Sequence, residues 1–297
     1  MKLKQSLIIT TFLFHATITG AVTEVQRTAI NELLQKNDWD TAMDLAEDLV
    51  DAHPQSSLAH YLLASAIRVK MQEVSQVRAM FSIGDYKESL AKAIELDPQN
   101  LDARTEEIGF YMFAPGMAGG DKAVAANKIA ALKMVNQIKG LEMEAQLAAV
   151  NEDQAGAVTV LQSLIALDPH NPGALMQLAV VAMQDNDFQQ ADEYLLNITA
   201  EQDAGWPLMA TYQRAKARVL AKQDLDTAID LLIAYRQALP EVVSALSLPD
   251  DSAVYWRMAL AHEQQGEVSE AIRLLRQSVQ LNGDFEPAQE DLDRLTE

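Results

Sequence analysis

Side chains that could support acid–base, nucleophilic or metal chemistry do not occur at the spacing that such chemistry requires. The chain has five histidines and no cysteine. His262-Glu263 is followed by Gln264, Gln265 and Gly266, whereas a zinc-binding helix places a second histidine four residues after the first. The 43 aspartate and glutamate residues are spread along the chain, so no carboxylate pair for general acid–base catalysis stands out. We therefore expect no catalytic residue, no metal ligand and no cofactor, and we interpret the chain as a protein without enzyme activity.

A glycine-rich segment, Ala114-Pro115-Gly116-Met117-Ala118-Gly119-Gly120, precedes an expected helix that begins near Asp121. The backbone N–H groups of such a segment can bind an anion at a helix start. A phosphate-binding loop, however, follows a strand and ends in Lys followed by Ser or Thr. Here the segment follows an expected helix, and Lys122 is followed by Ala123. We interpret the segment as a tight structural turn in which glycine adopts positive φ, with anion binding as the alternative.

Residues 1–21 have the order of features found in an export signal. Lys2 and Lys4 precede the apolar run Ser6–Phe14, and Thr19-Gly20-Ala21 offers small residues for cleavage. The run is shorter than the roughly 20 apolar residues that span a bilayer, although an uncleaved anchor is the alternative. Because the chain has no cysteine for lipid attachment, we expect a periplasmic or otherwise exported protein that is free of the membrane after signal cleavage.

The charge of the chain limits its partners. There are 23 basic and 43 acidic residues, which gives a formal net charge of −20. Nucleic-acid binding depends on clustered Lys and Arg, and the same negative charge would repel an anionic membrane. With 49% hydrophobic residues, the chain has enough apolar side chains for a packed core. We expect a solvated acidic surface, or alternatively an acidic field that selects basic partners.

One helix start recurs along the chain. Four segments share a turn residue, a bulky apolar residue shortly after it and an alanine three residues later: Asn37–Ala42, Asn186–Ala191, Gln223–Ala228 and Gly266–Ala271. Helix ends recur too, since Ile94–Asn100 and Ile165–Asn171 share the pattern Ile-x-Leu-Asp-Pro-x-Asn. These two copies lie about 70 residues apart, which equals two repeats of about 35 residues.

This pattern resembles the tetratricopeptide repeat, a pair of helices of about 34 residues in which small residues allow close packing. The resemblance implies an all-α, right-handed superhelix of about seven helix pairs over residues 22–297. The clearest repeats lie near residues 22–55, 172–203, 205–240 and 252–285, and residues 286–297 form a capping helix. Extra residues near Met71–Ser82 and Leu239–Asp251 are interpreted as lengthened helices or as loops that shape a binding face.

Residues 57–139 are similar to a narrower group of exported bacterial tetratricopeptide proteins. The segments that carry this likeness are Ala59–Leu63, Lys87–Leu90, Leu96–Ala103 and the Ala114–Gly120 turn. The group has no well-defined biochemical activity, so the likeness concerns fold and location.

In a stack of such repeats, the first helices of successive pairs line a concave surface. The side chains expected there are mostly apolar: Tyr61, Arg68, Met176, Val180, Met183, Gln213, Trp256 and Leu260. Methionine suits adaptable recognition and tryptophan is a frequent binding anchor, although the same residues could instead pack between neighbouring repeats. Our hypothesis is a non-catalytic scaffold or adaptor that binds a protein or peptide. The alternatives are a chaperone-like holder of unfolded exported proteins, a regulatory subunit of a periplasmic enzyme, and self-association.

Overall fold

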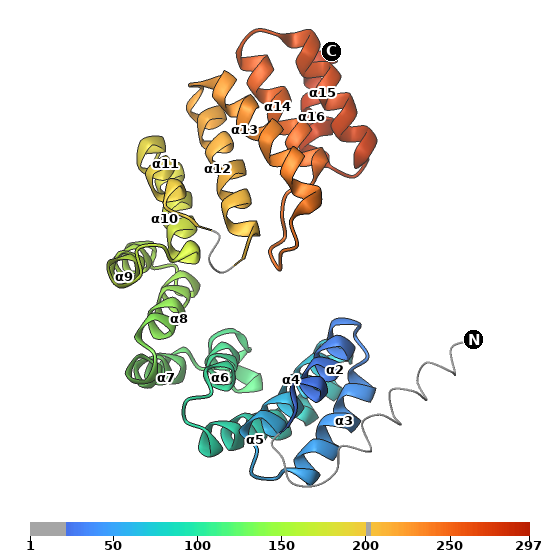
Figure 1. Cartoon of the computed structure of the whole chain (residues 1–297), viewed down its shortest axis with the longest axis vertical. Coiled ribbons are helices and arrows are strands. Elements are labelled where there is room, and N and C mark those ends of the chain that lie inside the picture. Colours follow the sequence, from blue (N-terminus) through green and yellow to red (C-terminus); the bar gives the residue numbers. More distant parts are fainter. Residues whose placement is uncertain (1–21, 200–202) are drawn as a thin grey trace, which may run out of the picture. The chain divides into compact units, whose positions relative to one another are not determined.

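The computed structural model describes residues 22–199 and 203–297, and the expected export signal lies outside these ranges. Within them all regular elements are helical, which confirms the all-α prediction (Figure 1). The fifteen α-helices of the described part are α2 Glu24–Gln35, α3 Trp39–Ala52, α4 Ser57–Glu73, α5 Gln76–Leu96, α6 Leu101–Phe113, α7 Lys122–Val135, α8 Gln137–Val150, α9 Gln154–Leu167, α10 Pro172–Gln184, α11 Phe188–Leu196, α12 Gly205–Ala221, α13 Leu225–Ala238, α14 Asp251–Gln264, α15 Val268–Leu281 and α16 Glu286–Thr296.

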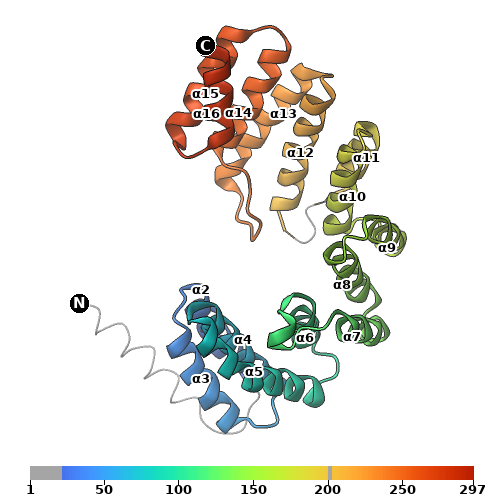
Figure 2. The same cartoon turned by 180° about the vertical axis from the view of Figure 1, so that it is seen from behind.

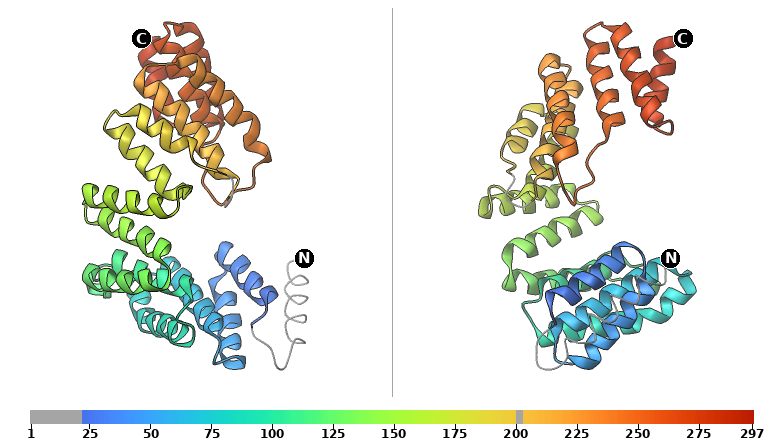
Figure 3. Two further views of the ribbon diagram at one scale, coloured as in Figure 1. Left: turned by 60° about the vertical axis from the view of Figure 1, so that its left-hand side comes forward. Right: turned by 45° about the vertical axis from the view of Figure 1, so that its right-hand side comes forward.

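These helices form two compact units, Met1–Asp153 and Gln154–Glu297. The described part of the first unit contains α2 to α8, and that of the second contains α9 to α16. In the second unit α12, α13 and α14 follow one another side by side (Figure 2), and α15 packs between α14 and the final helix α16 (Figure 3). Six of the seven expected pairs have their two helices in contact, namely α2–α3, α4–α5 and α6–α7 in the first unit and α10–α11, α12–α13 and α14–α15 in the second. The helices expected to form the fourth pair belong to different units, since α8 ends the first unit and α9 begins the second.

The recurring alanine is the contact point between paired helices. Ala42, Ala191, Ala228 and Ala271 are each 0% exposed. A methyl group is the largest side chain that lets two helix backbones approach so closely, and larger residues around it fill the remaining space. The turn before this alanine adopts positive φ at Asn37, Asn186, Asp224 and Gly266, which explains why Asn, Asp and Gly occur there.

The recurring Asp-Pro-x-Asn sequence joins one pair to the next. Asn100 Oδ1 accepts a hydrogen bond from the Ala103 backbone N–H at 2.9 Å, and Asn171 Oδ1 accepts one from the Ala174 N–H at 3.0 Å. Both asparagines therefore cap the next helix by satisfying a backbone donor that has no partner within the helix. The proline lies in the short link, where it cannot continue the preceding helix.

The two stretches of extra sequence have different structures. The extra residues around Met71–Ser82 lengthen α4 to 17 residues and α5 to 21 residues. At Leu239–Asp251 they form the short 3₁₀ helix η2, Leu239–Glu241, and an irregular segment before α14. This segment is attached to the core because Tyr235 Oη donates a hydrogen bond to the Pro249 carbonyl oxygen at 2.7 Å.

Candidate functional site

The first helices of successive pairs lie next to one another within each unit. In the first unit α2 contacts α4 and α6 contacts α8, and in the second unit α12 contacts both α10 and α14. We call the surface formed by these helices the first-helix face of each unit. It is the surface on which the sequence places its candidate partner-binding residues.

The first-helix face of the first unit carries a polar cluster around Glu106 of α6. Arg68 Nε of α4 donates to Glu106 Oε1 at 3.2 Å, and Tyr86 Oη of α5 donates to the same oxygen at 3.3 Å. The Glu106 side chain is only 13% exposed. Burial raises the pKa of this carboxyl above its usual range, although hydrogen bonds from Arg68, Tyr86 and Tyr61 oppose the shift. The structure thus brings the candidates Tyr61 and Arg68 together, and the charge of Arg68 is compensated by Glu106.

The Ala114–Gly120 segment between α6 and α7 is a turn built around the short 3₁₀ helix η1, Gly116–Ala118. Gly119 has φ +91°, and the Gly120 N–H donates to the Pro115 carbonyl oxygen at 3.2 Å. A Cβ atom at Gly120 would lie 1.8 Å from the Ala114 carbonyl oxygen. Both positions therefore require glycine for structural reasons, since Gly119 adopts positive φ and Gly120 has no room for a side chain.

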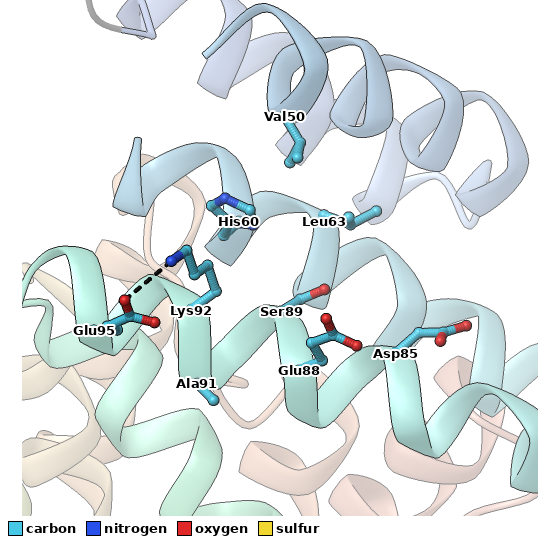
Figure 4. Close-up of a pocket in the computed structure, with 9 residues that line it drawn as sticks. All are labelled: Val50, His60, Leu63, Asp85, Glu88, Ser89, Ala91, Lys92 and Glu95. Atoms are coloured by element: carbon cyan, nitrogen blue, oxygen red, sulfur yellow. Dashed lines mark hydrogen bonds and ion pairs between the residues drawn. The ribbon is translucent and has the colours of Figure 1, made fainter. Parts of the chain in front are cut away.

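A shallow hollow of about 630 Å³ lies between α3, α4 and α5 in the first unit (Figure 4). The Lys92 ammonium group in its wall pairs with Glu95 Oε1 at 3.0 Å. His60 is half-buried at the hollow, and its Nε2 lies 3.0 Å from the Pro54 carbonyl oxygen. Sequence reasoning did not select this surface because most of its residues belong to the outer side of the second helix of a pair. The lining consists of Val50, His60, Leu63, Asp85, Glu88, Ser89, Ala91, Lys92 and Glu95.

In the second unit the apolar candidates are engaged in packing. Met183 of α10 is 6% exposed and belongs to the hydrophobic core between α10, α11 and α12. The structure therefore places Met183 inside the unit and not on a surface that faces a partner. Met176 and Val180 are half-buried against the same core, and Leu260 is half-buried against the core around α12 and α13. The period of a helix locates its inner side, but only the neighbouring helix decides how much of that side is covered.

Trp256 of α14 is half-buried in a fixed position. Its ring lies edge-on to Phe285, with 5.5 Å between ring centroids, and its Nε1 donates to Asp291 Oδ2 at 2.8 Å. The guanidinium carbon of Arg257 lies 4.3 Å from the centroid of the same ring. Contacts on both sides hold the ring in one orientation.

Two cations on this face were not among the candidates. Arg257 is 7% exposed, and its Nε is buried without a hydrogen-bond partner in the described structure. Lys216 of α12 has a lowered pKa because of burial and because of the nearby charge of Arg257. The candidate Gln213, one helical turn before Lys216, has a buried Oε1 that also has no partner in the described residues. A lysine between two alanines, as in Ala215-Lys216-Ala217, was the available sequence signal.

Two other cations of α12, Arg214 and Arg218, pair with Asp192, although Arg218 Nε is buried without a partner within the described residues. Asp192 Oδ1 accepts from Arg214 Nε and from an Arg218 terminal nitrogen, each at 2.8 Å. Burial acts to raise the pKa of Asp192, but the hydrogen bonds from Arg218 and Arg214 prevail and lower it. This network joins α11 to α12.

Within residues 22–199 and 203–297, no three His, Asp or Glu side chains are grouped as metal ligands. In the same ranges, no helix combines the length and apolar character needed to cross a membrane.

Comparisons with known proteins agree with the repeat architecture. Profiles of the tetratricopeptide repeat match residues 27–70, 151–218 and 253–284. No curated protein sequence matches the chain. A chain of the APC/C hetero-tetramer Cut9–Hcn1 is similar in structure, with a TM-score of 0.59 and 18% identity over 93% of this chain and 49% of that one. The present chain therefore spans about half of that relative.

Two further solved structures are similar over nearly their whole length. A tetratricopeptide repeat protein from Parabacteroides merdae has a TM-score of 0.50 and 13% identity, covering 92% of this chain and 98% of its own. The pilF protein of Pseudomonas aeruginosa has a TM-score of 0.51 and 12% identity, covering 91% and 96%. At these identities the likeness concerns the fold. With three profile matches and a matching arrangement of helix pairs, the chain is a tetratricopeptide repeat protein.

Proposed function

We propose that this protein is an exported, non-catalytic scaffold that binds a protein or peptide through a first-helix face. The observation that carries the proposal is the side-by-side arrangement of α10, α12 and α14, whose half-buried side chains include Met176, Gln213 and Trp256. Such a row of rigid helices offers a preformed surface, so that little conformational entropy is lost when a partner binds. Tetratricopeptide stacks extend this surface by adding repeats.

The structural neighbours support a role in protein assembly. One of them is part of a hetero-tetramer. Export is supported by the order of charged, apolar and small residues in positions 1–21. Together these features favour an adaptor outside the cytoplasm.

Affinity capture from a periplasmic extract tests the adaptor proposal. The bait is the tagged mature chain, and the test variant carries Met176→Ala and Gln213→Ala, two truncations on neighbouring first helices. The matched control carries Val268→Ala and Leu281→Ala, two exposed positions on α15, the second helix of its pair. We expect recovery of the main partner, measured by mass spectrometry, to fall about tenfold with the test variant only. Equal recovery with both variants would contradict binding through this face.

Export has a separate test. The full chain is expressed in a bacterial host, and the mass of the protein in the periplasmic fraction is measured. We expect a mature chain that begins near Val22. An intact chain that stays in the cytoplasm would refute the export proposal.

A chaperone-like holder is the second candidate, and exposed apolar side chains favour it. Phe81 of α5, Met117 of the Ala114–Gly120 turn and Met134 of α7 are 80%, 83% and 88% exposed. A holder would bind many unfolded chains and suppress the aggregation of a denatured test protein, whereas an adaptor would capture one stoichiometric partner. A second copy of this chain in the captured fraction would indicate self-association.

A further inference from the structure

One side of α5 carries apolar residues that no helix of the described residues covers. Val77, Met80 and Phe81 lie in the first two turns of α5 and are 67%, 50% and 80% exposed. Val77 lies three and four residues before the other two, so the three side chains form one continuous surface. Single exposed apolar residues are ordinary in a folded protein, whereas contiguous ones bordered by polar residues are typical of an interaction site.

The same side of α5 continues into the hollow between α3, α4 and α5. Asp85 lies four residues after Phe81, and Glu88 lies seven residues after it, which places all three on one side of the helix. In Figure 4 the side chains of Asp85, Glu88 and Glu95 follow one another along α5, across the hollow from α3 and α4. Gly84 adds no side chain here, and an added Cβ would meet nothing within 4 Å.

The apolar residues and the hollow therefore form one surface. We call it the α5 outer surface, and it consists of Val77, Met80, Phe81, Gly84 and the residues that line the hollow. It belongs mainly to the second helix of a pair and so differs from the first-helix face.

The hollow end of the α5 outer surface is negatively charged. Three carboxylates line it against one ammonium group, and that ammonium, on Lys92, pairs with Glu95 at 3.0 Å. Asp85 and Glu88 form no ion pair within residues 22–199 and 203–297. Helix α3, on the other side of the hollow, carries five acidic residues and no basic one. An incoming cation therefore meets a negative field that the protein's own cations do not compensate.

The hollow also has an apolar part, formed by Val50, Leu63 and Ala91. Lysine and arginine have long apolar stems that pack on such side chains while their charged ends reach carboxylates. Asp85 and Glu95 are about 15 Å apart along the helix axis, whereas the ligands of a metal ion all lie within about 2.6 Å of it. The carboxylates therefore suit several cationic groups along a chain better than one metal ion.

We propose that the α5 outer surface binds a basic, amphipathic segment of a partner polypeptide. Apolar side chains of that segment cover Val77, Met80 and Phe81, while its lysines or arginines reach Asp85 and Glu88. The proposal goes beyond the scaffold function, because it adds a second binding surface of different chemistry to the chain. It holds whether or not the first-helix face binds a partner.

The two parts of the surface make different contributions to binding. Burial of the apolar residues supplies affinity that does not depend on direction. The carboxylates favour a cationic segment over a neutral one and speed the encounter. A neutral apolar segment lacks the second contribution, and a basic segment without apolar side chains lacks the first. This division separates the proposal from the promiscuous apolar binding expected of a chaperone-like holder.

The test titrates the mature full-length chain with a peptide of three Leu-Lys-Lys-Leu repeats that is acetylated and amidated at its ends. The leucines and lysines of this peptide fall on opposite sides of a helix. A peptide of three Leu-Gln-Gln-Leu repeats with the same ends is the neutral control. Calorimetry measures the affinity. The side-chain methyl resonance of Met80, assigned with Met80→Leu, shows by NMR whether the peptide lies on the α5 outer surface.

The charge variant carries Asp85→Asn and Glu88→Gln. Its matched control carries Asp230→Asn and Glu290→Gln, which remove two exposed carboxylates from the second unit. We expect the charge variant alone to bind the lysine peptide about tenfold more weakly, and the wild type to bind the neutral peptide at least tenfold more weakly than the lysine peptide. Unchanged affinity in the charge variant, or equal affinity for the two peptides, would overturn the proposal.

The apolar variant is Phe81→Ser, and its control is Leu196→Ser, which changes a 58% exposed leucine of α11. We expect Phe81→Ser to weaken binding of the lysine peptide about tenfold, and Leu196→Ser to leave it unaltered. If the peptide binds without shifting the Met80 resonance, the site lies elsewhere and the proposal is wrong. It is also wrong if the Met80 resonance shifts with protein concentration alone and Phe81→Ser abolishes that shift, since a second copy then covers the surface.

Discussion

Arg257 stacks on Trp256 with 4.3 Å between the guanidinium carbon and the ring centroid, and its Nε is buried without a partner among residues 22–199 and 203–297. The stacking compensates part of the desolvation of the cation, since a desolvated cation–aromatic contact contributes about 2 kcal/mol. A buried donor without an acceptor, such as Arg257 Nε, costs about 1–3 kcal/mol, and more where the group is charged. The contact therefore holds the guanidinium in place without offsetting this full cost.

The first prediction concerns the stability of Arg257→Met. Removal of the unpaired charge should raise the free energy of unfolding of the second unit by about 1–2 kcal/mol, as the gain in desolvation exceeds the lost stacking. Urea unfolding followed by tryptophan fluorescence measures this change in the free energy of unfolding. Arg276→Met, which changes an exposed cation, should stay within about 0.5 kcal/mol of the wild type. A less stable Arg257→Met would mean that the guanidinium is a net structural contributor.

The second prediction concerns pH and Glu106. Burial raises the pKa of this carboxyl above its ordinary value of 4.5, and the groups that face it are Tyr61 and Arg68 on α4 and Tyr86 on α5. Between 4.5 and the raised pKa, the folded state binds more protons than the unfolded state, so the Glu106 contribution to stability falls as pH rises. It is fully present below pH 4.5 and is lost above the raised pKa.

Glu106→Gln should remove this contribution. The stability of the wild type relative to Glu106→Gln should therefore decline from pH 4.5 toward pH 7, as measured by thermal unfolding at several pH values. Glu73→Gln, at an exposed carboxylate on α4, should show no such decline. If the stability of the wild type relative to Glu106→Gln increased with pH, the sign would be opposite and would contradict a raised Glu106 pKa.

The third prediction separates the glycines of the Ala114–Gly120 turn. A Cβ at Gly120 would lie 1.8 Å from a backbone oxygen that cannot move freely, whereas a Cβ at Gly116 would meet nothing within 4 Å. Gly120→Ala should lower the free energy of unfolding by about 2–3 kcal/mol, and Gly116→Ala should change it by less than about 1 kcal/mol. Chemical denaturation followed by circular dichroism distinguishes them. Similar effects for the two variants would show that the turn does not depend on this close approach.

The fourth prediction tests the close approach of α7 and α8 at Gly140. A Cβ there would lie 2.8 Å from Lys133 Cα, and we expect Gly140→Ala to destabilise the first unit by about 1–3 kcal/mol. At Gly109, inside α6, an added Cβ would meet nothing within 4 Å. Gly109→Ala should therefore stabilise by about 1 kcal/mol, because alanine has the better helix propensity. Both variants replace glycine by alanine, and their melting temperatures should shift in opposite directions relative to the wild type.

Local patterns in the sequence predicted much of the fold. The alanines Ala42, Ala191, Ala228 and Ala271 mark positions where only a small side chain fits between paired helices, and each is fully buried. Asn100 and Asn171 mark helix starts because their side chains cap backbone donors a few residues away. Interactions of this kind depend on residues within one repeat, so their spacing along the chain is enough to reveal them.

The sequence by itself therefore determined the repeat class, the helix pairs and the presence of a capping helix. Only the tertiary structure decided which inner-side residues are covered, such as Met183, and which buried polar atoms lack a partner within the described residues, such as Arg257 Nε and Gln213 Oε1. Arg257 and Gln213 lie on α14 and α12, which are separated along the chain and adjacent only because the two helices pack side by side. Helical periodicity gives the direction of a side chain from its own axis, whereas burial and pairing depend on the neighbouring helix, which periodicity does not locate.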